Sequence, residues 1–451
     1  MVALVPAVLT LMLGALGLGR QAWRDEHATW HAATMSWPLL REHLSQVDIV
    51  LLPYYLLMRV WITVFGDSVV AMRLPSLLAM ACAAGLTGLL GSRLFDRWTG
   101  LAGGCLFAVV PSVSRFGQEA RPYAFAIAFA VASLLALLAH RWWLVSVMVA
   151  LTGLAHLVAL LVLLAHVPVM LRGRASAGSG GAGSGGAGSG GADSSIFPEN
   201  AASAAREAAF SGKVLRPWII AVVVGLVPVI PIAILGVSQT GQVSWIDAGW
   251  RSLASLPFSL ARSAAVAGIL AALAIVGVLG RRWDWRLTML VVWGLGPPSV
   301  LFVVAHDLFY YRYLLFVLPA WVLAAGLALR KRAAAIAAVG AALLLGVPDQ
   351  LALRHSPLPG DQDYRAAAAY VAQHMSPSDG IWFEGYADGR ERLGFAYELR
   401  GRAMPTECAG CAARLWLVSN GPNASVPVGF AVVEKRSFPG ITIYFLRATP
   451  Q

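Results

Sequence analysis

Charged residues are scarce in this chain of 451 residues. They make up 13% of it, whereas a soluble globular domain carries about 25%. Only three of the 34 basic residues are lysine, so arginine supplies nearly all of the positive charge. Cysteine is rare as well, with four residues in all. So low a content of charge argues against a chain made only of soluble domains.

Apolar residues take the place of the missing charge. They form 58% of the chain, the mean hydropathy is +0.69, and apolar runs of nearly 20 residues recur. Such runs predict an all-α, multi-pass protein of the cell membrane. The net charge of +11 then indicates topology rather than nucleic-acid binding, because cytoplasmic loops of membrane proteins collect arginine and lysine. We expect the bilayer, and no nucleic acid, as a partner.

The apolar runs predict about eleven transmembrane helices. No basic segment precedes the first run, which favours an uncleaved span over a signal peptide. The eleven runs are 2–18, 71–92, 100–114, 123–139, 142–154, 156–171, 217–236, 257–279, 287–305, 311–329 and 333–348. Residues 49–65 either span or lie in the interface, and we favour an interfacial helix with Arg59 snorkelling.

Composition also divides the chain into four parts. A transmembrane module, 1–172, precedes a Gly/Ser-rich stretch, 173–213, that is typical of a flexible cytoplasmic linker. More predicted spans fill 214–348, and hydropathy then falls. Residues 349–451 alternate a helical pattern with strand patterns, which predicts a small α/β domain outside the cytoplasm.

That last part contains "CAGC", with Cys408 and Cys411. A CxxC pair is ambiguous between a redox motif, half of a metal site and a local disulfide. No second CxxC is present, which argues against zinc. An oxidising compartment favours a structural disulfide.

Acidic and basic residues gather in the loops that we place on the outer face. Charges at membrane depth usually pair, line water or act chemically. Asp25 and Glu26 could be ordinary helix-capping acids, or one of them could face a polar cleft. Asp48 could cap an interfacial helix or meet Asp25 across a pocket. Arg121 is either an anion site or a partner of a nearby acid, and Arg312 either grips a phosphate or anchors the interface.

Several of these segments together resemble one family. "RDEHAT", "VDIVLLPYYLLMRVW…FGDSVVAMRLPS", "GQEARPYA", "QTGQVSWI" and "YYRYLLFVLPA" occur in the order found in GT-C glycosyltransferases. Within them the chain looks like the bacterial protein O-mannosyltransferase-like branch, glycosyltransferase family 39, of actinobacterial type. The resemblance covers about residues 1–330, and it departs from the family at His27, where a small residue is expected.

The resemblance implies a polyprenyl-phosphate-linked sugar as donor and transfer on the outer face to a lipid, glycan or protein acceptor. Asp25 matches the catalytic base, with Glu26 and Asp48 as rivals. The donor phosphate is assigned to Arg121, Arg312 and Gln118. The sugar and acceptor pocket is assigned to Glu119, Tyr123, Tyr54, Gln242, Trp245 and His306.

The chemistry also suits these residue types on its own terms. A lipid phosphate is a good leaving group that needs cations to hold its developing charge, and an acceptor hydroxyl needs a carboxylate to take its proton. Direct displacement would invert the anomeric centre. No cofactor is required, although a divalent cation could bind through His27, His31 and the acids. The rival hypotheses are a transporter or flippase of lipid-linked sugars and a non-catalytic scaffold.

Overall fold

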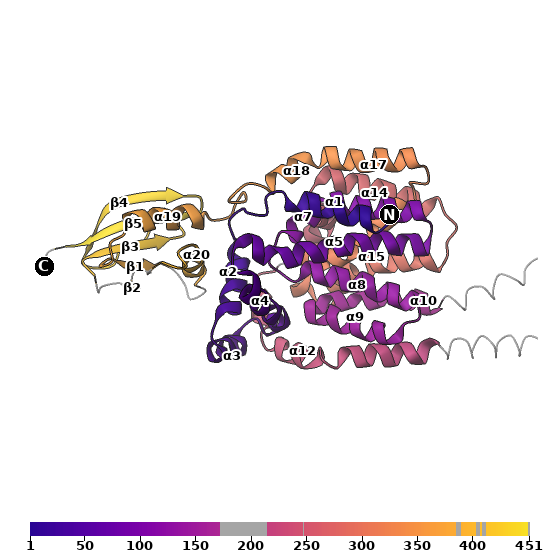
Figure 1. Ribbon diagram of the computed structural model, residues 1–451, viewed down its shortest axis with the longest axis horizontal. Coiled ribbons are helices and arrows are strands. Elements are labelled where there is room, and N and C mark those ends of the chain that lie inside the picture. Colours follow the sequence, from indigo (N-terminus) through magenta and orange to yellow (C-terminus); the bar gives the residue numbers. More distant parts are fainter. Residues whose placement is uncertain (172–213, 247, 385–388, 403–405, 408–411, 450–451) are drawn as a thin grey trace, which may run out of the picture.

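The computed structural model describes all residues other than 172–213, 247, 385–388, 403–405, 408–411 and 450–451. Cys408 and Cys411 lie outside the described residues, and their disulfide stays a prediction. Figure 1 shows a bundle of helices that run along the long axis of the molecule, with a domain built on a β-sheet at one end. A mostly helical bundle followed by a small α/β domain is therefore confirmed.

Helices from both halves of the sequence build the bundle. Those of the first half are α1 (Leu4–Ala15), α5 (Val69–Leu94), α6 (Arg97–Val109), α7 (Pro111–Gly117), α8 (Tyr123–Leu138), α9 (Trp142–Ala155), η2 (Leu157–Val162) and α10 (Leu163–Leu171). Those of the second half are Val214–Leu226, α12 (Ile230–Val237), η3 (Thr240–Val243), α13 (Trp250–Ala261), α14 (Ala264–Leu279), α15 (Trp285–Val304), η4 (His306–Leu308), η5 (Tyr311–Val317), α16 (Leu318–Gly326), α17 (Arg332–Leu345) and α18 (Val347–Ala352).

Glycines allow α5 and α6 to approach backbone to backbone. A Cβ added at Gly100 would lie 2.3 Å from the carbonyl oxygen of Gly88, and one added at Gly91 would lie 2.8 Å from the Cα of Gly100. Small residues at such contacts are typical of helix packing in membranes, where close approach replaces the hydrophobic effect as the source of association.

The predicted number of eleven spans is not confirmed. Among the described residues, α5 and α15 are long and apolar enough to cross a membrane, and the number rises to five if three bent helix pairs each count as one span. Several other helices are apolar but only 10–17 residues long. The runs that hydropathy identifies are thus largely present as apolar helices, but many are divided.

Identifiable residues divide these runs. The predicted span 257–279 is not one helix, because α13 and α14 meet at 98°. Arg262, with φ +53°, ends α13, and the Ser263 side chain accepts the Val266 amide hydrogen at the start of α14. The run 100–114 bends by 65° where Pro111 opens α7, since proline cannot continue the hydrogen-bond ladder of α6.

Four short elements gather at the end of the bundle beside the C-terminal domain (Figure 1). They are α2 (Arg24–Thr34), α3 (Trp37–Gln46), η1 (Ile49–Leu51) and α4 (Leu52–Phe65). The ambiguous stretch 49–65 is therefore helical and packs against α2. Its interfacial position stays a prediction. Together these elements form the first loop between bundle helices, and α2 contains the acids noted in the sequence.

In its described residues, the C-terminal domain packs two helices and five strands. Its elements are α19 (Tyr364–His374), β1 (Gly380–Phe383), α20 (Arg390–Glu398), β2 (Thr406–Glu407), β3 (Arg414–Ser419), β4 (Phe430–Phe438) and β5 (Ile441–Ala448). The sheet order is β2-β1-β3-β5-β4, with β1 parallel to β2 and β3 and the other pairs antiparallel. Tyr364, Phe395, Trp416 and Ile443 belong to its core. The predicted helix and strands are confirmed, whereas α20 has no counterpart in the sequence-based expectations.

Candidate active site

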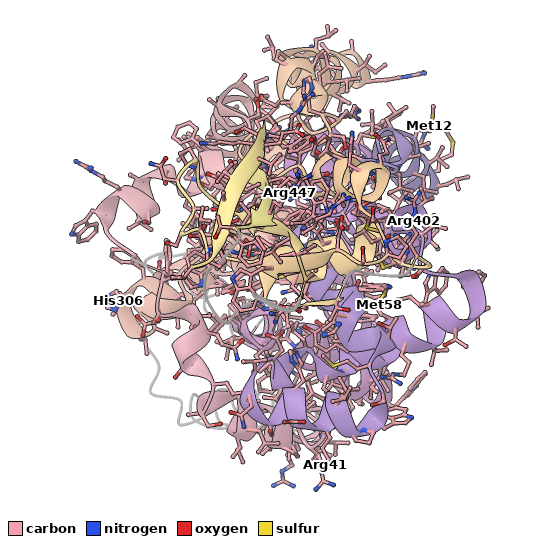
Figure 2. The ribbon with its side chains drawn as sticks, turned by 90° about the vertical axis from the view of Figure 1, so that its left-hand side faces the viewer. Met12, Arg41, Met58, His306, Arg402 and Arg447 are labelled. Atoms are coloured by element: carbon pink, nitrogen blue, oxygen red, sulfur yellow. The ribbon has the colours of Figure 1, made fainter. Side chains whose placement is uncertain are left out.

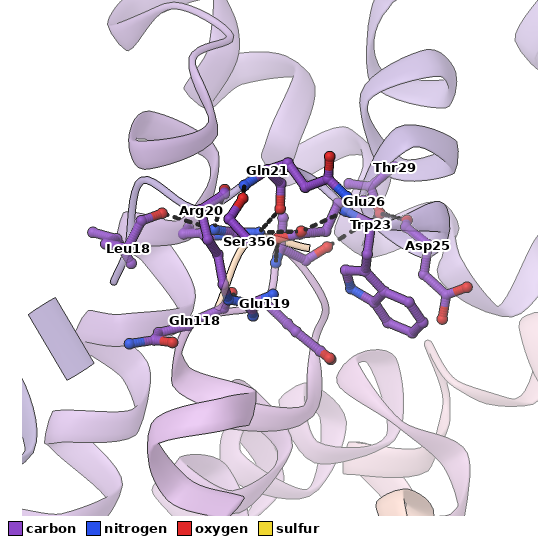
Figure 3. Close-up of polar contacts among 12 residues, drawn as sticks. Leu18, Arg20, Gln21, Trp23, Asp25, Glu26, Thr29, Gln118, Glu119 and Ser356 are labelled. Atoms are coloured by element: carbon purple, nitrogen blue, oxygen red, sulfur yellow. Dashed lines mark hydrogen bonds and ion pairs between the residues drawn. The ribbon is translucent and has the colours of Figure 1, made fainter. Parts of the chain in front are cut away.

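Asp25 lies in the first turn of α2, and its carboxylate points away from the dense network around its neighbour (Figure 3). Its Oδ2 is 3.0 Å from Nη1 of Arg312 and 3.9 Å from Nη2 of Arg121. Its Oδ1 is 3.4 Å from Nε of Arg24. The fold therefore brings together the proposed base and both proposed phosphate-binding arginines, although Arg312 follows Asp25 by 287 residues.

The arginines control the charge of Asp25. Its side chain is 13% exposed, and this burial acts to raise its pKa. The charges of Arg121, Arg312 and Arg24 outweigh burial and hold the pKa below its ordinary value. Asp25 is therefore ionised at neutral pH.

The two arginines retain unused hydrogen-bonding capacity. In the described part of the chain, no partner contacts the buried Nε atoms of Arg121 and Arg312, Nε1 of Trp23 or Nδ1 of His156. The Arg312 guanidinium lies over the rings of Trp23, at 5.5 Å, and Tyr310, at 4.8 Å. Buried polar atoms are nearly always bonded in native proteins, so this concentration of unsatisfied nitrogens suits an anionic ligand.

Glu26, the next residue, is fully buried and fully bonded. Its Oε1 accepts from Nε of Arg73 at 2.7 Å and from the amide of Ala120 at 3.0 Å. Its Oε2 accepts from Nη2 of Arg73 at 2.5 Å and from the amide of Trp23 at 3.2 Å. Burial would raise the pKa of Glu26, but Arg73 and these donors lower it to about 2.

Arg73, on α5, completes that network. Its Nη1 donates to the carbonyls of Leu18, at 2.7 Å, and Arg20, at 2.9 Å, and its Nη2 donates to that of Gln21 at 3.0 Å. With the two bonds to Glu26, all five N–H groups of this buried guanidinium have partners. The pair fixes the segment that leads into α2 and leaves Glu26 no access to an acceptor hydroxyl.

Asp48 lies near these residues but in a separate set of contacts. Its backbone has φ +61°, and its carboxylate accepts the Tyr55 hydroxyl at 2.7 Å instead of capping η1. In the amide orientation that satisfies both groups, Gln242 donates to Oδ1 of Asp48 at 2.9 Å and accepts from its amide at 3.1 Å. The charge of Asp48 acts on Arg121, as that of Asp25 does, so Arg121 links the two acids.

Two residues of the "GQEARPY" segment, Gln118 and Glu119, are bonded to other parts of the protein. Gln118, expected at the phosphate, is buried and uses its Nε2 to donate to the carbonyls of Gly14 and Leu16 at the end of α1. Glu119 is buried in an ion pair with Arg115, and burial raises its pKa despite that pair. The expected phosphate contact of Gln118 therefore has no support in the geometry.

The remaining predicted pocket residues differ in burial. Tyr123 is buried, with its ring 5.7 Å from that of His156. Tyr54 is buried beside Ser76, and Trp245 packs edge-on against Tyr310 at 5.1 Å. His306 is exposed and lies far to one side when the molecule is viewed from the C-terminal domain (Figure 2). Two other assigned pocket residues, Gln242 and Trp245, are exposed as well.

Sequence reasoning missed three residues of the site. Trp23 packs under Arg312 and also under Arg115, at 5.1 Å. Tyr55 lies in the stretch 49–65 that we expect in the interface, and His156 begins the predicted span 156–171. His156 ends α9 at the break before η2, and a histidine within an apolar run was the available signal.

The histidines considered as cation ligands lie apart from the site. His27 is buried against aromatic rings, and His31 has its pKa lowered by burial and by His43. The described residues contain no group of three or more His, Cys, Asp or Glu side chains that could hold a metal ion.

No model of a known protein family matches the chain, and no curated protein matches its sequence.

Several solved structures have folds similar to that of this chain. The chain is similar to ArnT from Cupriavidus metallidurans in the apo state, with 13% identity, a TM-score of 0.62, and coverage of 99% of this chain and 98% of that one. It is also similar to the Archaeoglobus fulgidus oligosaccharyltransferase in complex with Zn and sulfate (12%, TM-score 0.53, 93% and 68%). A third similar structure is the mycobacterial arabinofuranosyltransferase AftD (14%, TM-score 0.52, 99% and 40%). These are GT-C glycosyltransferases, so the predicted GT-C fold is confirmed.

Proposed function

We propose that this protein is a membrane glycosyltransferase that moves a sugar from a polyprenyl-phosphate donor to an acceptor hydroxyl with inversion. Asp25 is the general base, and Arg121 and Arg312 hold the phosphate of the donor. The observation that carries this proposal is the contact of one ionised carboxylate with two guanidiniums, each of which has a buried Nε–H group without a hydrogen-bond partner among the described residues. The shared fold with ArnT, which was also solved bound to undecaprenyl phosphate, supports it.

The charges of the site match those of the reactants and those of the products. Arg121 and Arg312 supply two positive charges, which balance ionised Asp25 and the single negative charge of a phosphodiester donor. The acceptor hydroxyl gives its proton to Asp25 as its oxygen bonds to the anomeric carbon. The bond from that carbon to the phosphate oxygen breaks, and its electron pair leaves with polyprenyl phosphate. Neutral Asp25 and a doubly charged phosphate then face the same two guanidiniums.

Arg312 must change partners during this sequence. Before the donor binds, its contact with Asp25 at 3.0 Å holds that carboxylate in a low-pKa, weakly basic state. A donor phosphate competes for the guanidinium and thereby weakens its hold on Asp25. The pKa of Asp25 then rises toward the range in which a carboxylate accepts a proton efficiently.

The second acid cluster fits a supporting part in the same site. Asp48 is hydrogen-bonded to Tyr55 and Gln242, which leaves it less available than Asp25 as a base. Trp245 and Tyr310 extend an aromatic wall from Arg312, a surface suited to a sugar face or a lipid. The proposed donor sugar is a hexose, with mannose first because of the resemblance to the O-mannosyltransferase-like branch.

The test is transfer of label from radiolabelled polyprenyl-phosphate-mannose by the purified protein in lipid. Asp25→Asn preserves shape and removes the base, and we expect a loss of about 10²- to 10⁴-fold relative to wild type. Asp307→Asn is the matched control, since Asp307 is an exposed acid in η4, and its rate should equal that of wild type.

Each alternative result has a separate meaning. Transfer at the normal rate by Asp25→Asn would remove Asp25 from the chemistry. Movement of label across the bilayer without a glycosylated product would favour a transporter. Absence of product with mannose, and with other lipid-linked sugars tried in turn, would contradict transfer altogether.

A further inference from the structure

The C-terminal domain is joined to the segment before α2 through one glutamine. Gln21 donates from Nε2 to the carbonyl of Gln362 at 2.6 Å, and its Oε1 accepts from the amide of Arg365 at 3.2 Å. Its own amide donates to the hydroxyl of Ser356 at 2.9 Å (Figure 3). The carbonyl of Gln21 belongs to the Arg73 network, so the domain is tied directly to the structure that fixes the start of α2.

A second junction is formed by α20. The Tyr397 hydroxyl donates to the carbonyl of Asp67 at 2.9 Å, and Arg400 pairs with the Asp67 carboxylate at 3.1 Å. That carboxylate also accepts from Nε1 of Trp30 on α2 at 3.0 Å. Tyr397 is 1% exposed and packs in the apolar cluster beneath α2, although it belongs to the C-terminal domain.

His27 lies between the two parts of the molecule. Its ring is 5.0 Å from that of Tyr364, on α19, and 5.4 Å from that of Tyr397, on α20. The side chain is fully buried, and neither ring nitrogen has a hydrogen-bond partner in the described residues. Burial lowers its pKa to about 4, so a neutral ring fills this space. His27 therefore acts through packing.

Helix geometry makes α2 the shared wall of both contacts. Residues 25 and 27 are separated by about 200° around a helix, so Asp25 faces the arginines while His27 faces the C-terminal domain. On the side of the bundle, Thr29 donates to the carbonyl of Ala120 at 3.1 Å. A shift of α2 away from the domain would move Asp25 relative to Arg121 and Arg312.

We propose that the C-terminal domain is a clamp that holds α2 against the bundle, with His27 and Tyr397 as positioning residues for Asp25. The inference rests on the proposed function, because it assigns the domain a part in the same transfer reaction. It differs from a passive tether, which would need none of the buried contacts that α19 and α20 make with α2. Transfer geometry tolerates little displacement, so loosening the clamp should slow the chemical step more than it weakens donor binding.

The test uses the full chain in lipid nanodiscs and the labelled donor that is active in the transfer assay. His27→Ala and Tyr397→Ala should each lower kcat about tenfold per folded molecule, with KM for the donor within about twofold of wild type. His27→Phe should restore most of the rate, since a ring of similar size refills the space. Tyr370→Phe is the control, because it removes a hydroxyl from the same domain where that group contacts Glu434 instead of α2.

A pH profile distinguishes positioning from general stability. The groups around Asp25 are Arg24 on its own helix, Arg121, Glu119 and Tyr123 from the α7–α8 region, and Arg312 and Tyr313 from η5. Those facing His27 are Glu26, Arg73 and Arg400, with Tyr364 and Tyr397. Loosening α2 weakens the hold of the arginines on Asp25, so the acid limb of kcat should move to higher pH in the alanine variants.

The outcomes separate the clamp from the transfer proposal. A lower kcat with a shifted acid limb, rescued in His27→Phe, supports the clamp. Wild-type kinetics in both alanine variants would overturn it, and so would a loss that follows only the amount of folded protein with an unmoved acid limb. Asp25→Asn is measured alongside: if that variant is active, the proposed base is wrong, whereas an inactive Asp25→Asn with normal clamp variants rejects the clamp alone.

Discussion

Asp25 and Glu26 are adjacent acids, and each forms a cluster with the arginines that it contacts. The two clusters differ in whether the N–H groups of those arginines all have hydrogen-bond partners. Glu26 is fully buried and accepts four hydrogen bonds, and its partner Arg73 has a bond for each of its N–H groups. Asp25 is partly exposed, and its partners Arg121 and Arg312 each keep a buried Nε for which the described residues supply no hydrogen-bond partner.

The difference separates a structural ion pair from an exchangeable one. In the saturated pair, Glu26 with Arg73, loss of either partner would leave a buried charge unpaired, so this pair resists rearrangement. The unsaturated cluster, Asp25 with Arg121 and Arg312, can accept another anion with little reorganisation, because donors already point at the place where the anion would bind. What distinguishes the two acids is the bonding capacity that their arginines have left, since residue type and local sequence are nearly the same.

The largest expected effect is on stability and comes from the saturated cluster. Glu26→Gln keeps the shape of the side chain but leaves the charge of Arg73 buried without a counterion. We expect the free energy of unfolding to fall by about 3–5 kcal/mol. Denaturant unfolding of the purified protein in detergent, followed by tryptophan fluorescence, measures it.

Asp25→Asn is the matched comparison for that change. Its arginines remain partly solvated and near other acids, so we expect a loss of about 1 kcal/mol. Equal destabilisation by the two substitutions would show that both clusters are structural, and the distinction between them would fail.

The sequence predicted the residues of the unsaturated cluster better than those of the saturated one. Asp25, Arg121 and Arg312 stand out as charges at the ends of apolar runs, and the family resemblance assigned each of them a role. Arg73 was not identified, because a single arginine near the start of an apolar run shows no partner until the fold brings Glu26 to it. The sequence likewise does not show the bonds of Gln118 to the end of α1, because they depend on tertiary structure.

The fold shows the same division. Apolar runs located most bundle helices, and strand patterns located the strands of the C-terminal domain. It did not locate the 98° break at Arg262 and Ser263, where backbone conformation and a capping hydroxyl act within a continuous apolar run. It also did not reveal α20, whose contacts with α2 stabilise a helix of mixed polarity.

A smaller effect is expected from changing the donor geometry of the unsaturated cluster. Arg312→Lys retains the charge but loses the planar guanidinium that can reach Asp25 and a phosphate together. We expect kcat/KM for the lipid donor to fall about 10- to 100-fold in the transfer assay.

Arg24→Lys serves as the control for that substitution. Arg24 also pairs with Asp25, but its side chain is 39% exposed, and such pairs contribute little. Its rate should stay within about twofold of wild type. Similar losses in the two variants would mean that charge near Asp25, rather than the geometry of Arg312, governs transfer.

A last effect is the response of stability to acid, where both acids contribute in the same direction. The pKa of each is lower in the folded protein than its ordinary value, so each stabilises the fold above that ordinary value and loses this contribution as pH falls through the folded pKa. For Glu26 the loss of this stabilisation spans pH 4.5 to about 2.

Thermal unfolding midpoints of wild type and Asp25→Asn should therefore both decline between pH 4.5 and about 2, because both proteins retain Glu26. The difference between the two unfolding midpoints should become smaller as Asp25 becomes protonated in the wild type. A midpoint of Asp25→Asn that did not change between pH 4.5 and 2 would show that the saturated pair is not the source of acid sensitivity.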